Sequence, residues 1–407
     1  MAAIIAIAST LATASPTMLG SFARGTALFL AVLALWVIQL VPLPPSLWLS
    51  MPGHAILAQS AVIANEPQPW RPLSLSPDLT IEAMLALMVP VAAIILTLRA
   101  PQRWLEQAPL ALMILTVLSV ALAAGQAAGE PDSALRWYPV SDIDVAPGLL
   151  ANRNHQGLLV SLGIPSAFIW AMAEKPGRLP LGPRLLIAFA VTALCVIGAL
   201  ITQSRGAMLF VVLGTLLSAA AIRHDIVRQI GARLALVAVS IGTVVIAGIA
   251  SLALPYQRLT EVVATDDRAY IWADTIKMLW AYFPFGSGGG TFVDTYPRFQ
   301  GIARLRPEYV NHAHNELLEF ISENGLIGMM LIGAGAWMLI SRMAQIAREK
   351  QSSPLLGSGR LAAILIMLSI VASLVDYPLR APLMTSLFAC AVVILRRARS
   401  ESHVGAA

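Results

Sequence analysis

"HAHNELLEFISENGLIGMMLIGAGAWMLI", from His312 to Ile340, places two histidines and three glutamates at the start of a long apolar run. Glu316, Glu319 and Glu323 follow at i, i+3 and i+7 spacing, which sets them on one face of a helix. The apolar run is long enough to cross a bilayer, which takes roughly 20 residues. Ionisable groups at membrane depth almost always face a bundle interior or a wet cavity. The stretch therefore predicts a transmembrane helix that begins at a functional site.

The composition of the whole chain is that of an integral membrane protein. Of its 407 residues 57% are hydrophobic and 12% are charged, whereas soluble domains carry about 25% charged residues. Residues 2–14 are apolar but short and lack a positive n-region, which favours a partial span over a cleaved signal peptide. Stretches long enough to span occur ten times, at about 25–42, 81–98, 108–126, 155–173, 185–202, 206–222, 234–254, 315–341, 360–377 and 381–395. We expect an all-α, polytopic transmembrane helical bundle of 10–12 spans, forming a single integral membrane domain over residues 1–407.

The placement of lysine and arginine predicts which side of the membrane each loop faces. With the C-terminal "RRARS" taken as cytoplasmic, alternate short segments hold sixteen basic residues and the opposite side holds eleven, six of them in the loop 255–314. Long loops count little in the positive-inside rule. The net charge of +5 follows from this bias and does not indicate nucleic acid binding. The longer and more varied loops are therefore expected on the non-cytoplasmic side.

The longest outer loop, residues 255–314, contains its own helix. "TDDRAYIWADTIKMLWAYFP" opens with a threonine and two aspartates, which suit a helix N-terminus. Its apolar residues recur at a spacing of 3–4, and two tryptophans on such a stripe suit an amphipathic helix lying in the membrane interface. The helix ends at "PFGSGGGTF" (Pro284–Phe292). These glycines either permit a sharp return of the backbone or cradle a phosphate, but the P-loop lysine and a preceding strand are missing.

Two arginines in outer segments are candidate anion ligands. Arg205 lies in "SRG", a tight turn between two apolar stretches. It either snorkels to lipid phosphates or acts as a fixed guanidinium that binds a phosphate bidentately. Arg268 lies in the first turn of the amphipathic helix, where it is either a solvated charge beside aspartates or a second phosphate ligand near the helix N-terminus. Two arginines from separate loops would suit a diphosphate.

The histidines at the start of the quoted stretch leave three interpretations open. In the first, His314 and Asn315 cap the helix and the acids balance Arg304 and Arg306. The second is a zinc site from His312 and His314, although i, i+2 spacing is poor for two ligands on one helix face. The third is a histidine base supported by an acid.

Polar residues at other span mouths complete the candidates. Asn152 and Asn154 in "NRNHQG" either cap a transmembrane helix or offer amides to sugar hydroxyls. Asp376 and Arg380 in "VDYPLRAP" either pair across a short turn or line the same cavity as the histidines.

These motifs, in this order, resemble the signature of the O-antigen ligase and polymerase superfamily. The pattern His-(Asn/Ser/Gln), nine residues, Gly, two residues, Gly is matched by His314, Asn315, Gly325 and Gly328. The "SRG" turn, an Arg-x-x-x-Trp pair, "PFGSGGGTF" and "DYPLRAP" also occur in the order that this family shows. The resemblance covers residues of about 150–385.

The resemblance implies a polytopic glycosyltransferase of the bacterial inner (cytoplasmic) membrane, with its active site facing the periplasm and with no cofactor. The donor would be an undecaprenyl-diphosphate-linked glycan. Ligases pass it to lipid A-core in lipopolysaccharide, and polymerases pass it to another repeat unit of a surface polysaccharide or exopolysaccharide. Related enzymes use protein, an option that the compact outer loops weaken; between the other two we favour the polymerase slightly.

The motif match also assigns roles to residues. Arg205 and Arg268 would hold the donor diphosphate, and His314 would be the base that activates the acceptor hydroxyl. Direct displacement would invert the anomeric centre, and no metal is required because guanidinium groups can stabilise the leaving diphosphate. The expected substrate-binding residues are Asn152, Asn154, His312, Asn315, Glu323 and Arg380.

The alternative from another class is a polytopic transporter of a small molecule or a lipid-linked sugar. Transporters bind at the bilayer midplane through broken helices, often in inverted repeats. In this chain the spans hold almost no mid-membrane charges, ionisable residues crowd one face, and no repeat is visible. These features favour surface chemistry over transport, and over the third option of a non-catalytic assembly protein.

Overall fold

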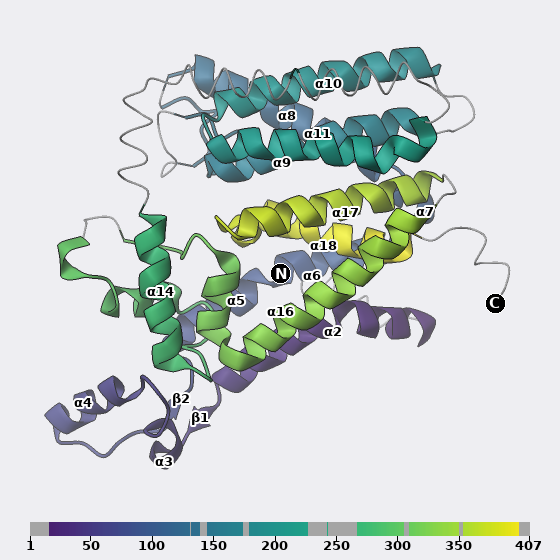
Figure 1. Cartoon of the computed structure of the whole chain (residues 1–407). Coiled ribbons are helices and arrows are strands. Elements are labelled where there is room, and N and C mark those ends of the chain that lie inside the picture. The colour runs from purple at the N-terminus through teal and green to yellow at the C-terminus, as the bar shows by residue number, and fades with distance from the viewer. Residues whose placement is uncertain are drawn as a thin grey trace. The chain divides into compact units, whose positions relative to one another are not determined.

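The structure, a computed structural model, describes residues 16–130, 132–138, 145–173, 179–226, 242, 267–304, 309–349 and 353–398. These residues are mostly helical (Figure 1). Five of the described helices are long and apolar enough to cross a membrane: Pro77–Arg99, Ala108–Ala128, Leu181–Ile201, Glu316–Arg348 and Pro354–Ser373. Shorter apolar helices cover Ala27–Gln39, Ala55–Ala64 and Arg205–Ala221. The chain is therefore a helical, multi-pass membrane protein, as the sequence predicts.

The expected spans agree closely with the observed helices. Nine of the ten apolar stretches coincide with helices in the described part of the chain. The remaining stretch, 234–254, and the partial span at residues 2–14 lie outside the described residues. One expected span differs in detail, because the helix over 315–341 is broken near its start.

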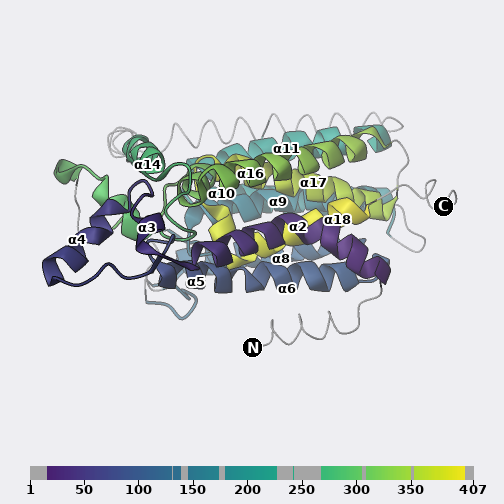
Figure 2. The ribbon, with the colours of Figure 1, turned by 90° about the horizontal axis from the view of Figure 1, so that it is seen from below.

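The chain divides into two compact units, the first of which comprises Met1–Ile95, Thr265–Ile340 and Ser373–Tyr377. In both views α3 and α4 of this unit lie beyond the end of α2 (Figures 1 and 2). Two short strands, β1 and β2, pair antiparallel with Pro42 opposite Pro72. The elements of the first unit are α2 (Pro16–Gln39), β1 (Pro42–Leu43), α3 (Pro45–Trp48), α4 (Ala55–Ala64), β2 (Arg71–Pro72), α5 (Pro77–Ala86), most of α6 (Met88–Arg99), α14 (Arg268–Tyr282), α15 (Phe292–Thr295), η1 (Tyr296–Arg298), η2 (Ile302–Arg304) and most of α16 (Glu316–Arg348).

The second unit comprises Leu96–Ala264, Ser341–Ala372 and Pro378–Ala407. Its elements are α7 (Gln102–Leu105), α8 (Ala108–Ala128), α9 (Arg153–Met172), α10 (Leu181–Ile201), α11 (Arg205–Ile226), most of α17 (Pro354–Ser373), η3 (Pro378–Arg380) and α18 (Pro382–Arg397).

Helix α9 is the centre of the second unit. It packs against α8, α10 and α11, and every side chain from His155 to Ile169 is buried. Glycine permits this close contact, because a Cβ at Gly157 would lie 2.3 Å from the Cβ of Ala207. Small residues at helix interfaces are the usual means of bringing backbones together in a membrane. Tight packing around α9 therefore holds the start of this helix firmly in place.

In the first unit, α16 bends sharply at Gly325. This residue has φ 59° and ψ −143°, and Figure 1 shows the bend between the two parts of the helix. The amide of Leu326, just after the bend, donates to the Pro284 carbonyl at 2.9 Å. Backbone groups away from water require such partners. The bend is therefore stabilised by the loop that follows α14.

The glycine-rich loop that contacts this bend makes the sharp return that its composition predicts. Gly286, Gly288 and Gly290 have φ of 83°, 109° and 78°, in the left-handed region that favours glycine. A Cβ at Gly286 would lie only 2.3 Å from the Glu323 carbonyl oxygen. The expectation of a backbone return is confirmed.

We predict that Gly325→Ala lowers the free energy of unfolding by about 1–3 kcal/mol, the range for a residue forced into an unfavourable backbone region. The new Cβ would also lie 2.0 Å from the Pro284 carbonyl oxygen. The thermal midpoint of the detergent-solubilised protein measures the effect. The matched control is Gly333→Ala on the same helix, where a Cβ meets open space. This control should be neutral or more stable by about 0.5–1 kcal/mol. Equal midpoints for the two variants would contradict the role of Gly325.

Candidate functional site

The segment His312–Asn315, which leads into α16, carries several of the candidate side chains. Asn315 stands at the N-terminus of the helix, where its Oδ1 accepts a hydrogen bond from the Leu318 amide at 3.0 Å and its carbonyl accepts one from the Glu319 amide at 3.0 Å. This is the geometry of a helix N-cap. The capping role proposed for Asn315 is therefore seen directly.

The carboxylate of Glu319 fixes the residues before the cap. It is 1% exposed. Its Oε1 lies 2.9 Å from His312 Nδ1, and its Oε2 accepts a hydrogen bond from the Ala313 amide at 2.7 Å. A buried carboxylate requires such partners, because burial without them costs several kcal/mol. Glu319 therefore determines the path of the chain at His312 and Ala313.

His314 occupies a different environment from His312. Its backbone is left-handed, with φ 50°. Its Nδ1 is buried and lies 3.4 Å from Asp376 Oδ1, while the side chain as a whole is 27% exposed. Since Nδ1 faces a carboxylate, Nε2 is the ring nitrogen available to a proton from outside. This contact agrees with the second interpretation of Asp376, in which it lies beside the histidines; the sequence did not indicate which histidine it would meet.

Tyr377 lies against both imidazole rings. Its ring centroid is 4.4 Å from that of His312 and 5.0 Å from that of His314. Its backbone amide donates to Asp376 Oδ1 at 3.0 Å. Sequence reasoning did not single out this tyrosine, because nothing in local spacing relates it to the histidines. The only available signal is its position beside Asp376 in the family's "DYPLRAP" segment.

The other two acids of the quoted stretch also have protein partners. Glu316 accepts a hydrogen bond from Ser373 Oγ. Glu323 is 0% exposed, and its Oε1 accepts a hydrogen bond from the Phe292 amide at 3.2 Å. The three acids therefore lie inside the protein, as their shared helix face suggests. Substrate binding by Glu323 stays a prediction, and this internal contact is the interaction that the structure shows for it.

The glycine-rich loop does not present its amides to a phosphate. The amides of residues 286–289 donate in turn to the Tyr282, Ser322 and Glu323 carbonyls and to Gln39 Oε1, at 2.9–3.2 Å. A phosphate-cradling loop needs free amides. The loop is therefore a structural contact between α2, α14 and α16.

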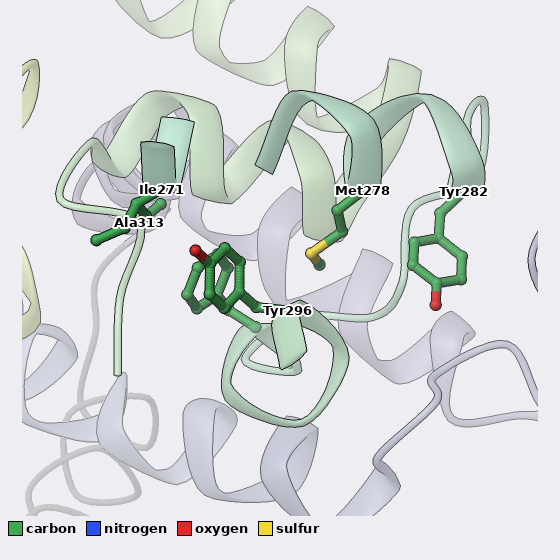
Figure 3. Close-up of a cluster of buried hydrophobic side chains, with 6 residues drawn as sticks. Ile271, Met278, Tyr282, Tyr296 and Ala313 are labelled. Atoms are coloured by element: carbon green, nitrogen blue, oxygen red, sulfur yellow. The ribbon is translucent and has the colours of Figure 1, made fainter. Parts of the chain in front are cut away.

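Helix α14 brings Arg268 close to the histidine segment. Arg268 is the first residue of the helix, and Ile271, one turn later, belongs to a buried cluster with Ala313 (Figure 3). The cluster consists of Ile271, Met278, Tyr282, Phe292, Tyr296 and Ala313. The first turn of α14 thus lies beside the backbone that joins His312 to His314.

The cluster under α14 is closed to water. Burial, with the nearby Asp274 carboxylate, raises the pKa of the Tyr296 phenol to about 12. Asp274 is itself buried, and its oxygens lie 2.7 Å from Lys277 Nζ and 3.6 Å from an Arg304 nitrogen. In contrast, Trp280 on the opposite face of α14 is 66% exposed. The apolar stripe expected from the sequence therefore faces outward. The opposite face of α14 packs into the buried cluster that includes Ala313, beside the histidines.

The remaining candidates belong to the second unit. Asn152 Oδ1 accepts a hydrogen bond from the Asn154 amide at 2.8 Å, which caps α9. Asn154 Oδ1 accepts one from Ser204 Oγ at 2.7 Å, so the mouth of α9 is joined to the "SRG" turn. Arg205 follows that turn as the exposed first residue of α11. Arg380, half-buried, ends η3 in the same unit.

The candidate residues thus form two groups, one in each unit. Arg268 is placed with the histidine–carboxylate pairs in the first unit, and Arg205 with Asn154 in the second. Binding roles for these residues remain predictions.

The segment that carries the histidines and Arg268 is similar to a known protein family. Residues 190–333 match the model of the O-antigen ligase family (Wzy_C). The chain carries an O-antigen ligase domain. This ligase domain includes the "SRG" turn, α14, the glycine-rich loop and the stretch from His312 to Gly328, but it ends before Asp376. No curated protein matches the sequence.

The match over these residues supports a function at a coarse level. An O-antigen ligase domain implies a glycosyltransferase of the ligase or polymerase type that acts on lipid-linked glycans. The ligase domain lies within a multi-pass membrane protein, as that substrate class requires.

We predict that Glu319→Ala lowers the free energy of unfolding by about 1–3 kcal/mol, because the buried Ala313 amide loses its acceptor. Glu319→Gln should cost less, since its side-chain oxygen still accepts one hydrogen bond. Thermal midpoints in detergent measure both changes, with Glu82→Ala as control because Glu82 is exposed on α5. A Glu319→Ala midpoint equal to that of the control would show that the carboxylate does not hold the segment.

Proposed function

We propose that this chain transfers a glycan from undecaprenyl diphosphate to an acceptor hydroxyl at the periplasmic face of the bacterial inner membrane. The observation that carries the proposal is the contact between His314 and Asp376. The imidazole belongs to the ligase domain and lies near the start of α14, and the carboxylate that supports it comes from a segment beyond that domain. The proposed functional region extends over residues 150–385, since Asn152 and Asp376 lie outside the matched segment.

The chemistry of the compartment supports a lipid diphosphate donor. The periplasm holds no ATP, so a transferase there needs a donor that is already activated and already in the membrane. Negative charge grows on the leaving diphosphate as the glycosidic bond breaks. Fixed guanidinium groups stabilise such charge in the transition state, which is the role proposed for Arg205 and Arg268. Guanidinium groups at this position remove the need for a metal ion.

The base step follows from the environment of His314. The acceptor oxygen attacks the anomeric carbon, the bond from that carbon to the diphosphate oxygen breaks, and its electron pair leaves with the diphosphate. The hydroxyl proton passes to Nε2 of His314. The Asp376 carboxylate near Nδ1 then stabilises the imidazolium that forms, as in other carboxylate–histidine pairs. A single displacement of this kind inverts the anomeric centre.

The orientation of the site is supported by the distribution of basic residues. Sixteen lysines and arginines lie in the short segments of one side, and the positive-inside rule assigns that side to the cytoplasm. His314, Arg205 and Arg268 all lie in segments of the opposite side. They would therefore face the periplasm.

We predict that His314→Ala abolishes glycan transfer, lowering it at least about 100-fold, because general base catalysis contributes about 10²–10⁴-fold. His314→Asn is the sharper variant, since asparagine tolerates the left-handed backbone at this residue but cannot accept the proton. Transfer is measured in membranes of a deletion strain that expresses each variant, normalised to protein level.

The control for this experiment is Asn311→Ala, which changes an exposed residue just before His312 and should leave transfer unchanged. Near-normal transfer by His314→Asn would remove the base assignment.

We predict that Arg205→Lys lowers transfer about tenfold or more, because lysine keeps the charge but loses the bidentate geometry of the guanidinium. The same membrane assay measures the change. Arg103→Lys, an exposed arginine of α7, is the matched control and should be silent. Full activity of Arg205→Lys would reduce Arg205 to a point charge or a lipid anchor.

The acceptor is identified by deleting the gene and analysing the surface glycans. Loss of all long chains from lipid A-core, with polymer accumulating on undecaprenyl diphosphate, defines a ligase. Decoration with a single repeat unit defines an O-antigen polymerase, and loss of exopolysaccharide alone defines the polymerase of that polymer. The compact outer loops weaken the option of a protein acceptor, and between the other two acceptors we favour the polymerase slightly. Unchanged glycans in all three classes would contradict the proposed function.

A further inference from the structure

We propose that Tyr377 is a positioning residue that holds the imidazole of His314 with its Nε2 directed to the acceptor hydroxyl. The inference rests on the proposed function, because it concerns the orientation of the proposed base. It adds a residue that lies outside the matched ligase domain, which ends at residue 333.

His314 has few restraints of its own. Its Nδ1 makes no hydrogen bond and lies 3.4 Å from the nearest Asp376 oxygen. Its backbone occupies the left-handed region, where no helix holds the residue. An imidazole in this situation can rotate about its side-chain bonds unless another group packs against it. The closest aromatic contact that the structure shows is Tyr377, at 5.0 Å with an interplanar angle of 67°.

Tyr377 also packs against a second imidazole, which is itself held in place. Its ring packs at 4.4 Å against His312. His312 is held by Glu319, whose carboxylate also accepts the Ala313 amide. The buried acid therefore holds His312, and His312 supports one side of the Tyr377 ring. The Tyr377 ring in turn packs against the imidazole of His314 and limits its rotation.

Tyr377 and Asp376 are neighbours in the chain and approach His314 together. The Tyr377 amide donates to the Asp376 carboxylate, and Pro378 follows at once. The two adjacent residues thus present a carboxylate to Nδ1 and an aromatic ring to the face or edge of the same imidazole. Edge-to-face aromatic contacts are favoured geometries. Such a pair defines both the tilt and the rotation of the base.

The test separates ring packing from the phenolic hydroxyl. Transfer kinetics are measured with the full-length protein in membranes, using undecaprenyl-linked glycan extracted from the deletion strain as the donor probe. Tyr377→Leu should lower kcat about tenfold and leave the KM for the donor within about twofold, the size expected when one aromatic contact is lost. Tyr377→Phe keeps the ring and should remain within about twofold of the wild type. Tyr309→Leu, at a tyrosine that is 75% exposed in the loop before α16, should change neither constant.

A second measurement reports on the imidazole without reference to activity. Diethyl pyrocarbonate modifies histidine nitrogens, and peptide mass mapping gives the rate at each histidine. Tyr377→Leu should change the rate at His314 several-fold. His54 is the internal control, because it is 1% exposed and both ring nitrogens contact backbone carbonyls at 2.9 Å. A general loosening of the fold would accelerate modification of His54 as well.

The outcomes distinguish this inference from the proposed function. A wild-type kcat for Tyr377→Leu, or a reduced kcat with an unchanged modification rate at His314, overturns the positioning role. A parallel increase at His54 also overturns it, since the effect would then be structural. Activity of His314→Asn in the same assay is a separate result that would remove the base assignment itself.

Discussion

The geometry around the histidines depends on one buried carboxylate, that of Glu319. An acid removed from water must be given hydrogen-bond or charge partners, or its burial opposes folding. In this protein the partners are the Ala313 amide and His312 Nδ1, which come from the chain immediately before α16. The need to satisfy the acid therefore fixes the approach of the backbone to the helix. His314, which follows directly, takes its place from that constraint.

The bend in α16 has a comparable effect over a longer distance. A glycine at residue 325 lets the helix change direction, and the Pro284 carbonyl compensates the amide that follows. Because that carbonyl belongs to the loop after α14, the bend also determines where α14 lies. Helix α14 then packs its buried face against Phe292, Tyr296 and Ala313. Packing and backbone satisfaction thus bring a helix N-terminus bearing Arg268 beside the proposed base.

Much of this organisation could be predicted from the sequence, because it is written in local patterns. Hydropathy located the described spans, helical spacing placed the three glutamates on one face, and composition indicated the return at "PFGSGGGTF". The idea of a histidine supported by an acid was also available, but the partners were not. Glu319 serves His312, whereas Asp376 serves His314 from a segment far along the chain. Local spacing carries no information on such a contact.

Glu323 makes another contact that local spacing does not reveal. Its carboxylate accepts a hydrogen bond from the Phe292 amide inside the protein, while substrate binding by Glu323 stays a prediction. The bend at Gly325 turned an expected continuous span into two parts, because tertiary packing of the return loop overrides the helical preference of the flanking residues. Tyr377 went unnoticed because nothing in local spacing relates it to the histidines. Aromatic residues near membrane helices are common, and only the fold shows which of them touches a functional group.

The contacts of His314 also bear on how this protein is divided into modules. The recognisable ligase segment ends at residue 333, whereas the two side chains that touch the imidazole are contributed by residues 376 and 377. A chimera joined at the edge of the recognisable segment would inherit the histidine and lose both neighbours. Recombination between related enzymes should therefore be tolerated more readily beyond Tyr377 than before it. The segment needed for the proposed chemistry is therefore longer than the segment by which the family is recognised.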